Sequence, residues 1–416
     1  MKNPLLLFFL LLSIIGTSRD TYETTKTEFI YGTISTFLGD TYTGQIRWGK
    51  EEAFWTDRFN ANKVYNRNID FLSDQEIMQL KREKQMLKKK DWKRMDDGQI
   101  QDDKSEYTFL HQFSCQFGEI KNIKMTRWQK AEIELRDGSK VMVSGKGMND
   151  LDTPITIYDT KKGKIEIEWM EISQVHFFEE PDLFKSAIGE SLYGTVFTSG
   201  GKYTGAIEWD TDERVTTDEL DGQHDKGKFK TPFSKIKAIQ SHLKGSLVTL
   251  KNGKQIYLFG TNDVNCENRG IVVTTKEIGR VNVSWADFEK VEFTQKKKTA
   301  KGYQFQKPRE ITGTVKTKEG KYIKGKIIFD LDEQYDYEVL NGGSGKMFYE
   351  IPFRNIRKIM PRGKRNCMVE LRSKKTIDLR DSQDVSFKNE GLLVFQESST
   401  SPVYVSWREV EEVVFN

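Results

Sequence analysis

Apolar and polar residues alternate in short runs along most of the chain, and one such run occurs three times. It reads "YGTVFTSGGKYTGAIEWD" at residues 193–210, with a close copy at residues 31–50 and a looser copy at residues 312–333. Ile207 and Trp209 fall on one side of this alternation and polar residues on the other. Alternation with a period of two is typical of half-buried strands, so each copy predicts a hairpin with one buried face.

Each copy is followed by the same series of apolar landmarks. First comes a triplet at spacing three, which predicts a single 3₁₀ or α turn because such residues share a face. A strand–turn–strand pattern follows, and a Trp with a second set at spacing three closes the series. The triplets are Phe117, Ile120, Ile123; Phe233, Ile236, Ile239; and Phe353, Ile356, Ile359. The closing residues are Trp169, Trp285 and Trp407. Matched landmarks at matched offsets predict three tandem repeats.

The two halves of each repeat also resemble each other. Each half begins with a strand and a turn, and five of the six turns carry a glycine, at Gly39, Gly138, Gly201, Gly253 and Gly320. The sixth turn has Lys374 at that position. Glycine suits a tight hairpin turn that needs a positive φ.

A half-unit of short strands with one helical turn before its closing strand resembles SH3-like and Sm-like barrels. The likeness rests on degenerate apolar and glycine positions and implies a fold only, since the motifs with which Sm-like proteins grip RNA are not found. We therefore predict an all-β protein of three tandem repeats. Each repeat is expected to form a pair of small SH3-like β-barrels, or one β-sandwich, with one basic helix inserted in the first.

The expected boundaries follow the landmarks. Residues 1–18 form a signal peptide, and the repeats cover residues 28–180, 191–293 and 310–416. A basic linker, residues 294–309, separates the last two repeats. The first repeat carries an insertion at residues 66–112, in which "SDQEIMQLKREKQMLKKKDWKRM" opens with a capping box from Ser73 to Glu76. That box and the lack of Pro and Gly predict a helix over residues 73–95.

The inserted helix is strongly basic and is the first candidate binding surface. Its cations outnumber its two acidic residues near the centre, Glu83 and Asp91. The candidate binding residues are Lys81, Arg82, Lys84, Lys88, Lys89, Lys90, Lys93 and Arg94. Such a helix could grip an acidic polymer or anionic lipid head groups. The alternative is a solvated helix that lies across the β domain with its long side chains reaching water.

An acidic turn follows the second strand of the recurring hairpin. The candidate metal ligands there are Asp210, Asp212, Asp330 and Asp332. Grouped carboxylates are ligands for calcium, although the spacing fits no EF-hand loop. Asp57, Asp218 and Glu338 follow nine residues after the strand's last aromatic residue. Side chains that cap the turns are the alternative explanation for this acidity.

The recurring tryptophans, such as Trp48 and Trp209, are expected to fill cores, whereas Trp55, Trp92 and Trp128 are freer to lie at the surface. Surface aromatics together with paired carboxylates keep one alternative open, a secreted carbohydrate-active enzyme or glycan-binding protein. The sequence holds no GxSxG, HExxH, Walker or dinucleotide motif, and its four His residues occupy unrelated positions. We therefore expect neither catalysis nor a cofactor.

The N-terminus and the composition set the remaining expectations. One Lys, an apolar run of about 11 residues and the small residues Gly16 and Ser18 are typical of a secretory signal peptide, with an uncleaved anchor as the alternative. The chain has 66 Lys and Arg residues against 62 Asp and Glu, so no global charge favours nucleic acid. Its three Cys residues suggest no disulfide framework. We expect an exported interaction or structural module of the cell envelope or extracellular space. An envelope protein or acidic polysaccharide is its expected kind of partner.

Overall fold

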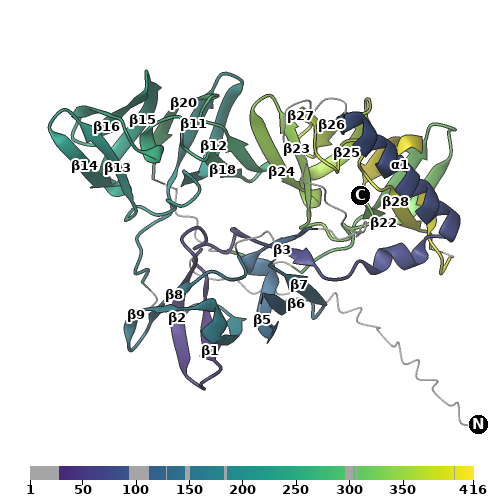
Figure 1. Ribbon diagram of the computed structural model, residues 1–416, viewed down its shortest axis with the longest axis horizontal. Coiled ribbons are helices and arrows are strands. Elements are labelled where there is room, and N and C mark those ends of the chain that lie inside the picture. The colour runs from purple at the N-terminus through teal and green to yellow at the C-terminus, as the bar shows by residue number, and fades with distance from the viewer. Residues whose placement is uncertain are drawn as a thin grey trace, which may run out of the picture.

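The computed structural model describes residues 28–92, 112–127, 129–145, 150–181, 185–295, 303–305, 307–397 and 399–416, without the side chains of residues 85–92 and 127. Over these residues the chain folds into antiparallel sheets with one α-helix, α1 (Asp74–Trp92), and short 3₁₀ turns. The predicted all-β class with one helix is confirmed. The strands fall into three successive sets of ten, which Figure 1 shows in purple to blue, in teal, and in green to yellow.

The strand bounds are as follows. The first set comprises β1 (Tyr31–Thr36), β2 (Thr41–Trp48), β3 (Arg58–Lys63), β4 (Gln112–Gln116), β5 (Ile120–Arg127), β6 (Lys130–Leu135), β7 (Lys140–Ser144), β8 (Ile155–Asp159), β9 (Gly163–Ile167) and β10 (Ile172–Phe177). The second comprises β11 (Tyr193–Thr198), β12 (Gly201–Trp209), β13 (Glu219–His224), β14 (Gly227–Pro232), β15 (Ile236–His242), β16 (Gly245–Leu250), β17 (Gln255–Leu258), β18 (Ile271–Thr275), β19 (Gly279–Val283) and β20 (Phe288–Phe293). The third comprises β21 (Thr312–Thr317), β22 (Tyr322–Phe329), β23 (Val339–Ser344), β24 (Met347–Pro352), β25 (Ile356–Pro361), β26 (Asn366–Leu371), β27 (Thr376–Arg380), β28 (Leu392–Phe395), β29 (Val403–Val405) and β30 (Val410–Phe415).

The same order of pairing occurs in all three sets. In the first set it runs β7–β6–β5–β10–β1–β2–β8–β9, and β3, which pairs with β4, joins this sheet through β7. The second and third sets pair in the equivalent order. The division into three domains at the expected boundaries stays a prediction.

The predicted small closed barrels are not what the strands form. The last strand of each set lies between two others, as β10 lies between β1 and β5. Both of its edges are therefore used for hydrogen bonds that join the two halves of the set into one sheet. Because neither edge of this last strand is left to close one half on itself, the strands form large open antiparallel sheets.

The expected turns are present. Short 3₁₀ helices begin at the first residue of each apolar triplet: η2 (Phe117–Glu119), η4 (Phe233–Lys235) and η6 (Phe353–Asn355). The turn glycines have positive φ, such as +88° at both Gly138 and Gly253. Lys374 adopts a φ of +70° at the turn that lacks glycine. That conformation is strained for a side chain with a Cβ.

The recurring tryptophans fill the cores, as expected. Trp48 and Trp209 are fully buried, and each indole N–H donates to a backbone carbonyl, at 2.7 and 2.9 Å. Trp285 is only half-buried. The expectation that Trp55 is freer to lie at the surface is wrong: it is completely buried because Phe305 packs edge-on against its ring, 5.0 Å between centroids. Trp128 and the side chain of Trp92 lie outside the described residues.

The three sets hold one another in place. Strand β19 of the second set pairs with β24 of the third, so their sheets are continuous. Tyr303 and Phe305, in the predicted basic linker, pack into the core of the first set. This part of the linker is therefore structural, and the first set lies below the joint between the other two (Figure 1).

Candidate functional site: the inserted helix and the acidic turns

Helix α1 begins where the sequence predicts. The Ser73 backbone N–H donates to the Glu76 carboxylate at 2.7 Å, and the Glu76 N–H lies 3.4 Å from the Ser73 hydroxyl. This reciprocal arrangement is the predicted capping box, and it satisfies two N–H groups at the helix start.

The first half of α1 is anchored on the third set of strands. Leu80 is 5% exposed and packs with Leu72 against Ile328, Leu331 and Leu393. Ile328 lies in β22, Leu331 in the turn after β22, and Leu393 in β28. Figure 1 shows α1 lying across this part of the sheet. Burial of such a side chain stabilises the docked helix by about 2 kcal/mol.

Two ion pairs flank this apolar contact. Glu83 pairs with Arg408 at 3.0 Å, and Lys84 pairs with the buried carboxylate of Glu390. Because charged groups at a partly buried contact must be paired, these bonds fix the rotation of the helix about its axis. The expectation of a helix lying across the β domain therefore holds for this half.

The structure separates the candidate binding residues into three groups. Lys81 and Arg82 are exposed, and Lys84 is half-buried against the body of the protein. Lys88, Lys89 and Lys90 lie on α1, but their side chains are not among those described. Lys93 and Arg94 lie outside the described residues. Binding by this set stays a prediction, and Lys84 has a structural contact of its own.

The acidic turn of the second set holds a cation of the chain itself. Ligand oxygens of Asp210, Asp212 and Glu213 lie within 4.8 Å of one another. The Arg269 guanidinium pairs with Asp210 at 3.2 Å and with Asp212 at 2.6 Å. Burial, together with the nearby Asp263 carboxylate, raises the pKa of Glu213 to about 10.

The acidic turn of the third set receives a cation from the first set. The Lys63 ammonium lies 2.5 Å from an Asp332 oxygen and 3.2 Å from Glu338. Asp330, fully buried, accepts a hydrogen bond from the Gln383 amide at 2.9 Å. The four predicted ligands thus divide between two turns, each of which contains a basic side chain. Metal binding at either turn stays a prediction.

Further carboxylates in these regions cap the backbone. Asp57, Asp218 and Glu338 each accept two backbone N–H bonds from the preceding loop, at 2.6–3.0 Å. This capping role agrees with the alternative that the sequence left open for the acidity. Arg214 pairs with Asp57, and Arg47 with Asp218 at 2.7 Å, so the same carboxylates also join the first and second sets.

A buried Asp at an equivalent place in each set accepts a backbone hydrogen bond and has a raised pKa. Asp150, Asp263 and Asp384 accept a backbone N–H bond from Asn60, Asp221 and Asn341 respectively. Burial raises the pKa of each of these three carboxyls to about 7. This position was missed from the sequence because its spacing varies: Asp263 and Asp384 lie 10 residues after Gly253 and Lys374, whereas Asp150 lies 12 residues after Gly138.

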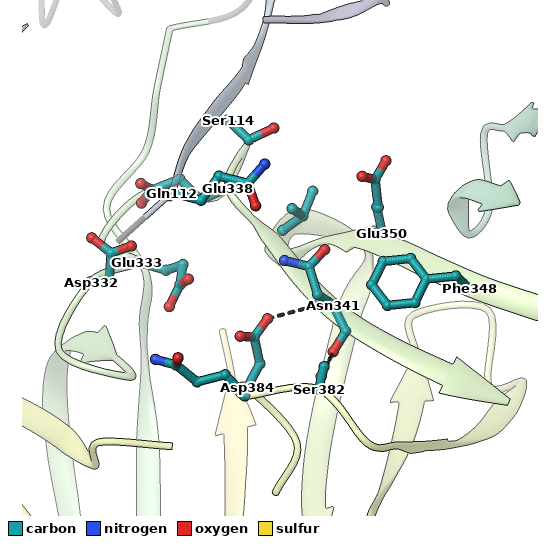
Figure 2. Close-up of a pocket in the computed structure, with 12 residues that line it drawn as sticks. Gln112, Ser114, Asp332, Glu333, Glu338, Asn341, Phe348, Glu350, Ser382 and Asp384 are labelled. Atoms are coloured by element: carbon teal, nitrogen blue, oxygen red, sulfur yellow. Dashed lines mark hydrogen bonds between the residues drawn. The ribbon is translucent and has the colours of Figure 1, made fainter. Parts of the chain in front are cut away.

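A cleft of about 280 Å³ lies between β4 of the first set and the β23–β24 hairpin of the third. Figure 2 shows carboxylates converging on it from several elements, including Asp332, Glu333, Glu350 and Asp384. Phe348, 42% exposed, forms part of its wall. The lining of the cleft is thus mainly acidic and polar.

Among the described residues no helix combines the length and the apolar character needed to cross a membrane. Comparison with protein-family models, with curated proteins and with solved structures found no match to the chain.

Proposed function

We propose that the protein is an exported, non-catalytic interaction module that binds an acidic polymer through helix α1. The observation that carries this proposal is the one-sided anchoring of the helix. Leu80, Glu83 and Lys84 are engaged with the third set of strands, while Lys81 and Arg82 are exposed.

Anchoring matters because it prepares the surface before the ligand arrives. A free helix of this composition would lose conformational entropy on binding, whereas a docked helix has already been ordered by its apolar contact. The ion pairs of Glu83 and Lys84 also prevent rotation of the helix, so the same residues face outward in every molecule.

The spacing of the basic positions suits an extended anion. Residues 81 and 88, and likewise 82 and 89, are seven positions apart and share a helix face. At 1.5 Å per residue the two members of each pair lie about 10 Å apart along the axis. Regularly spaced cations complement a chain with regularly spaced anionic groups better than they complement a single small ligand.

The test uses the full chain and a charge reversal, Lys81→Glu with Arg82→Glu, on a column of immobilised heparin as the polyanion. The matched control is Lys251→Glu with Lys254→Glu, an exposed pair on the β16–β17 turn. We expect the α1 variant to elute at clearly lower salt than the control, because exposed ion pairs are weakened by screening. Equal shifts in both variants, or no retention of the unmodified chain, would show that α1 is not the binding surface.

A further inference from the structure

The joint between the second and third sets shows how this fold accepts an added strand. In it, Arg280, Val281 and Asn282 of β19 lie opposite Glu350, Tyr349 and Phe348 of β24. The Arg280 guanidinium pairs with the Glu350 carboxylate at 3.1 Å. An opposite-charge pair across two strands stabilises the pairing.

The equivalent strand of the second set is β14. Its position is fixed by the hairpin register, because Lys230 lies opposite Asp221 as Glu350 lies opposite Asn341. Among the described strands β14 pairs with β13 alone. Figure 1 shows the β13–β14 hairpin at the outer end of the molecule. No described strand therefore pairs with the side of β14 that corresponds to the β19-binding side of β24.

The chain's own equivalents of β19 do not fit this edge. The pairing of β8 with β9 places Lys164 at the position of Arg280, so in the same register it would meet Lys230. Like charges directly opposite each other destabilise a strand pair. In the third set, the register of β28 and β29 places Pro402 at that position. Proline lacks the N–H that a ladder needs.

The charges on β14 indicate what would fit. Lys228 and Lys230 are both exposed and point to the same side of the strand, two residues apart. Lys230 pairs with Glu219 of β13 at 3.0 Å, but both side chains are largely exposed and such a pair is readily exchanged. An incoming strand with carboxylates at alternate positions would place one opposite each lysine.

We propose that the free edge of β14 is a docking site for an extended acidic segment of a partner protein, which adds to β14 as β19 adds to β24. Main-chain hydrogen bonds would supply the affinity, and the two lysines would select carboxylates over basic residues. This surface is separate from helix α1, so the inference does not rest on the proposed function.

The test uses two peptides whose sequences derive from β19 and its flanks. The first is residues 278–285, "IGRVNVSW", and the second is the same peptide with Arg280→Glu and Asn282→Glu. Each is added to the full chain, and amide hydrogen exchange of β14 is followed by mass spectrometry. We expect the acidic peptide to slow exchange in β14 and the unsubstituted peptide to have little effect there. Two cross-strand charge pairs make the affinity difference about twofold to thirtyfold.

The variant Lys228→Glu with Lys230→Glu completes the test. It should lose the response to the acidic peptide, while unchanged exchange in β19 and β24 shows that it is folded. Equal slowing by both peptides, no slowing in β14 at saturating acidic peptide, or a response that survives the double substitution would each overturn the proposal.

Discussion

Lys63 illustrates how single residues hold distant parts of this chain together. Its ammonium lies between Asp332 and Glu338, and all three side chains are buried. Replacing Lys63 with Met removes the positive charge but keeps much of the side-chain volume. The buried carboxylates of Asp332 and Glu338 then lack the Lys63 ammonium.

We expect Lys63→Met to lower the free energy of unfolding by about 3–5 kcal/mol, the cost of breaking a buried ion pair from one side. Urea denaturation measures this change. The control is Lys237→Met, an exposed lysine on β15. A loss in Lys63→Met no larger than in the control would mean that the ion pair does not stabilise the fold.

Asp263 makes stability depend on pH. Burial raises its pKa from 3.8 to about 7, so the folded state binds this proton more tightly than the unfolded state. Stability from this group is therefore present below about pH 4 and is lost as pH rises to about 7. In Asp263→Asn the side-chain oxygen can still accept the Asp221 N–H, now without a charge to desolvate.

We predict that Asp263→Asn reduces the fall in unfolding free energy between pH 5 and pH 7.5, by up to about 2.5 kcal/mol at 1.36 kcal/mol per pKa unit. Chemical denaturation at the two pH values gives the difference. The control is Asp225→Asn, which is exposed on the β13–β14 turn. The same pH dependence in Asp263→Asn and the unmodified chain would contradict this prediction.

At the scale of elements, the charge pair Arg280–Glu350 spans the joint between β19 and β24, and Arg280 also pairs with Glu208 at 3.1 Å. The variant Glu350→Lys imitates the lysine found at the same position of β14. We expect the two strands to separate more readily, with a loss of about 1 kcal/mol and faster amide exchange in both. Glu319→Lys, at an exposed hairpin turn, should leave that exchange unchanged. If Glu350→Lys does the same, charge does not control this joint.

Elements that depend on nearby residues could be predicted from the sequence, and those that depend on distant residues could not. The turn glycines, the 3₁₀ turns and the start of α1 were predictable because each depends on residues within a few positions. The pairing of β10 with β1 joins segments about 140 residues apart, and the alternation is the same whether a strand closes a barrel or extends a sheet. Trp55 could not be placed because Phe305, which covers it, lies in the distant linker.

In the candidate sites, too, the features set by nearby residues could be predicted and those set by distant residues could not. A basic helix was visible from its composition and its capping box, but its orientation depends on Leu80 meeting the third set of strands. Similarly, the acidic turns were visible, whereas Lys63 is contributed by another set and carried no sequence signal of that role. The free edge of β14 emerges only when equivalent registers are compared.

At the scale of the whole molecule, three sets of strands join into one body that presents α1 on its outside. Charges at the contacts are mostly paired within the chain: Arg47 with Asp218, Lys63 with Asp332, and Arg354 with Glu119 at 2.9 Å. Lys81 and Arg82 differ from these contact residues, because their side chains are exposed on an anchored helix. The central claim is that this helix contacts an acidic polymer.

Lysine acetylation, read by mass spectrometry on the full chain with and without heparin, tests that claim most directly. We predict that heparin protects Lys81 from acetylation, that Lys251 and Lys254 react at unchanged rates, and that the protection disappears at high salt. Equal protection of all three lysines, or no protection of Lys81 at saturating heparin, would contradict it.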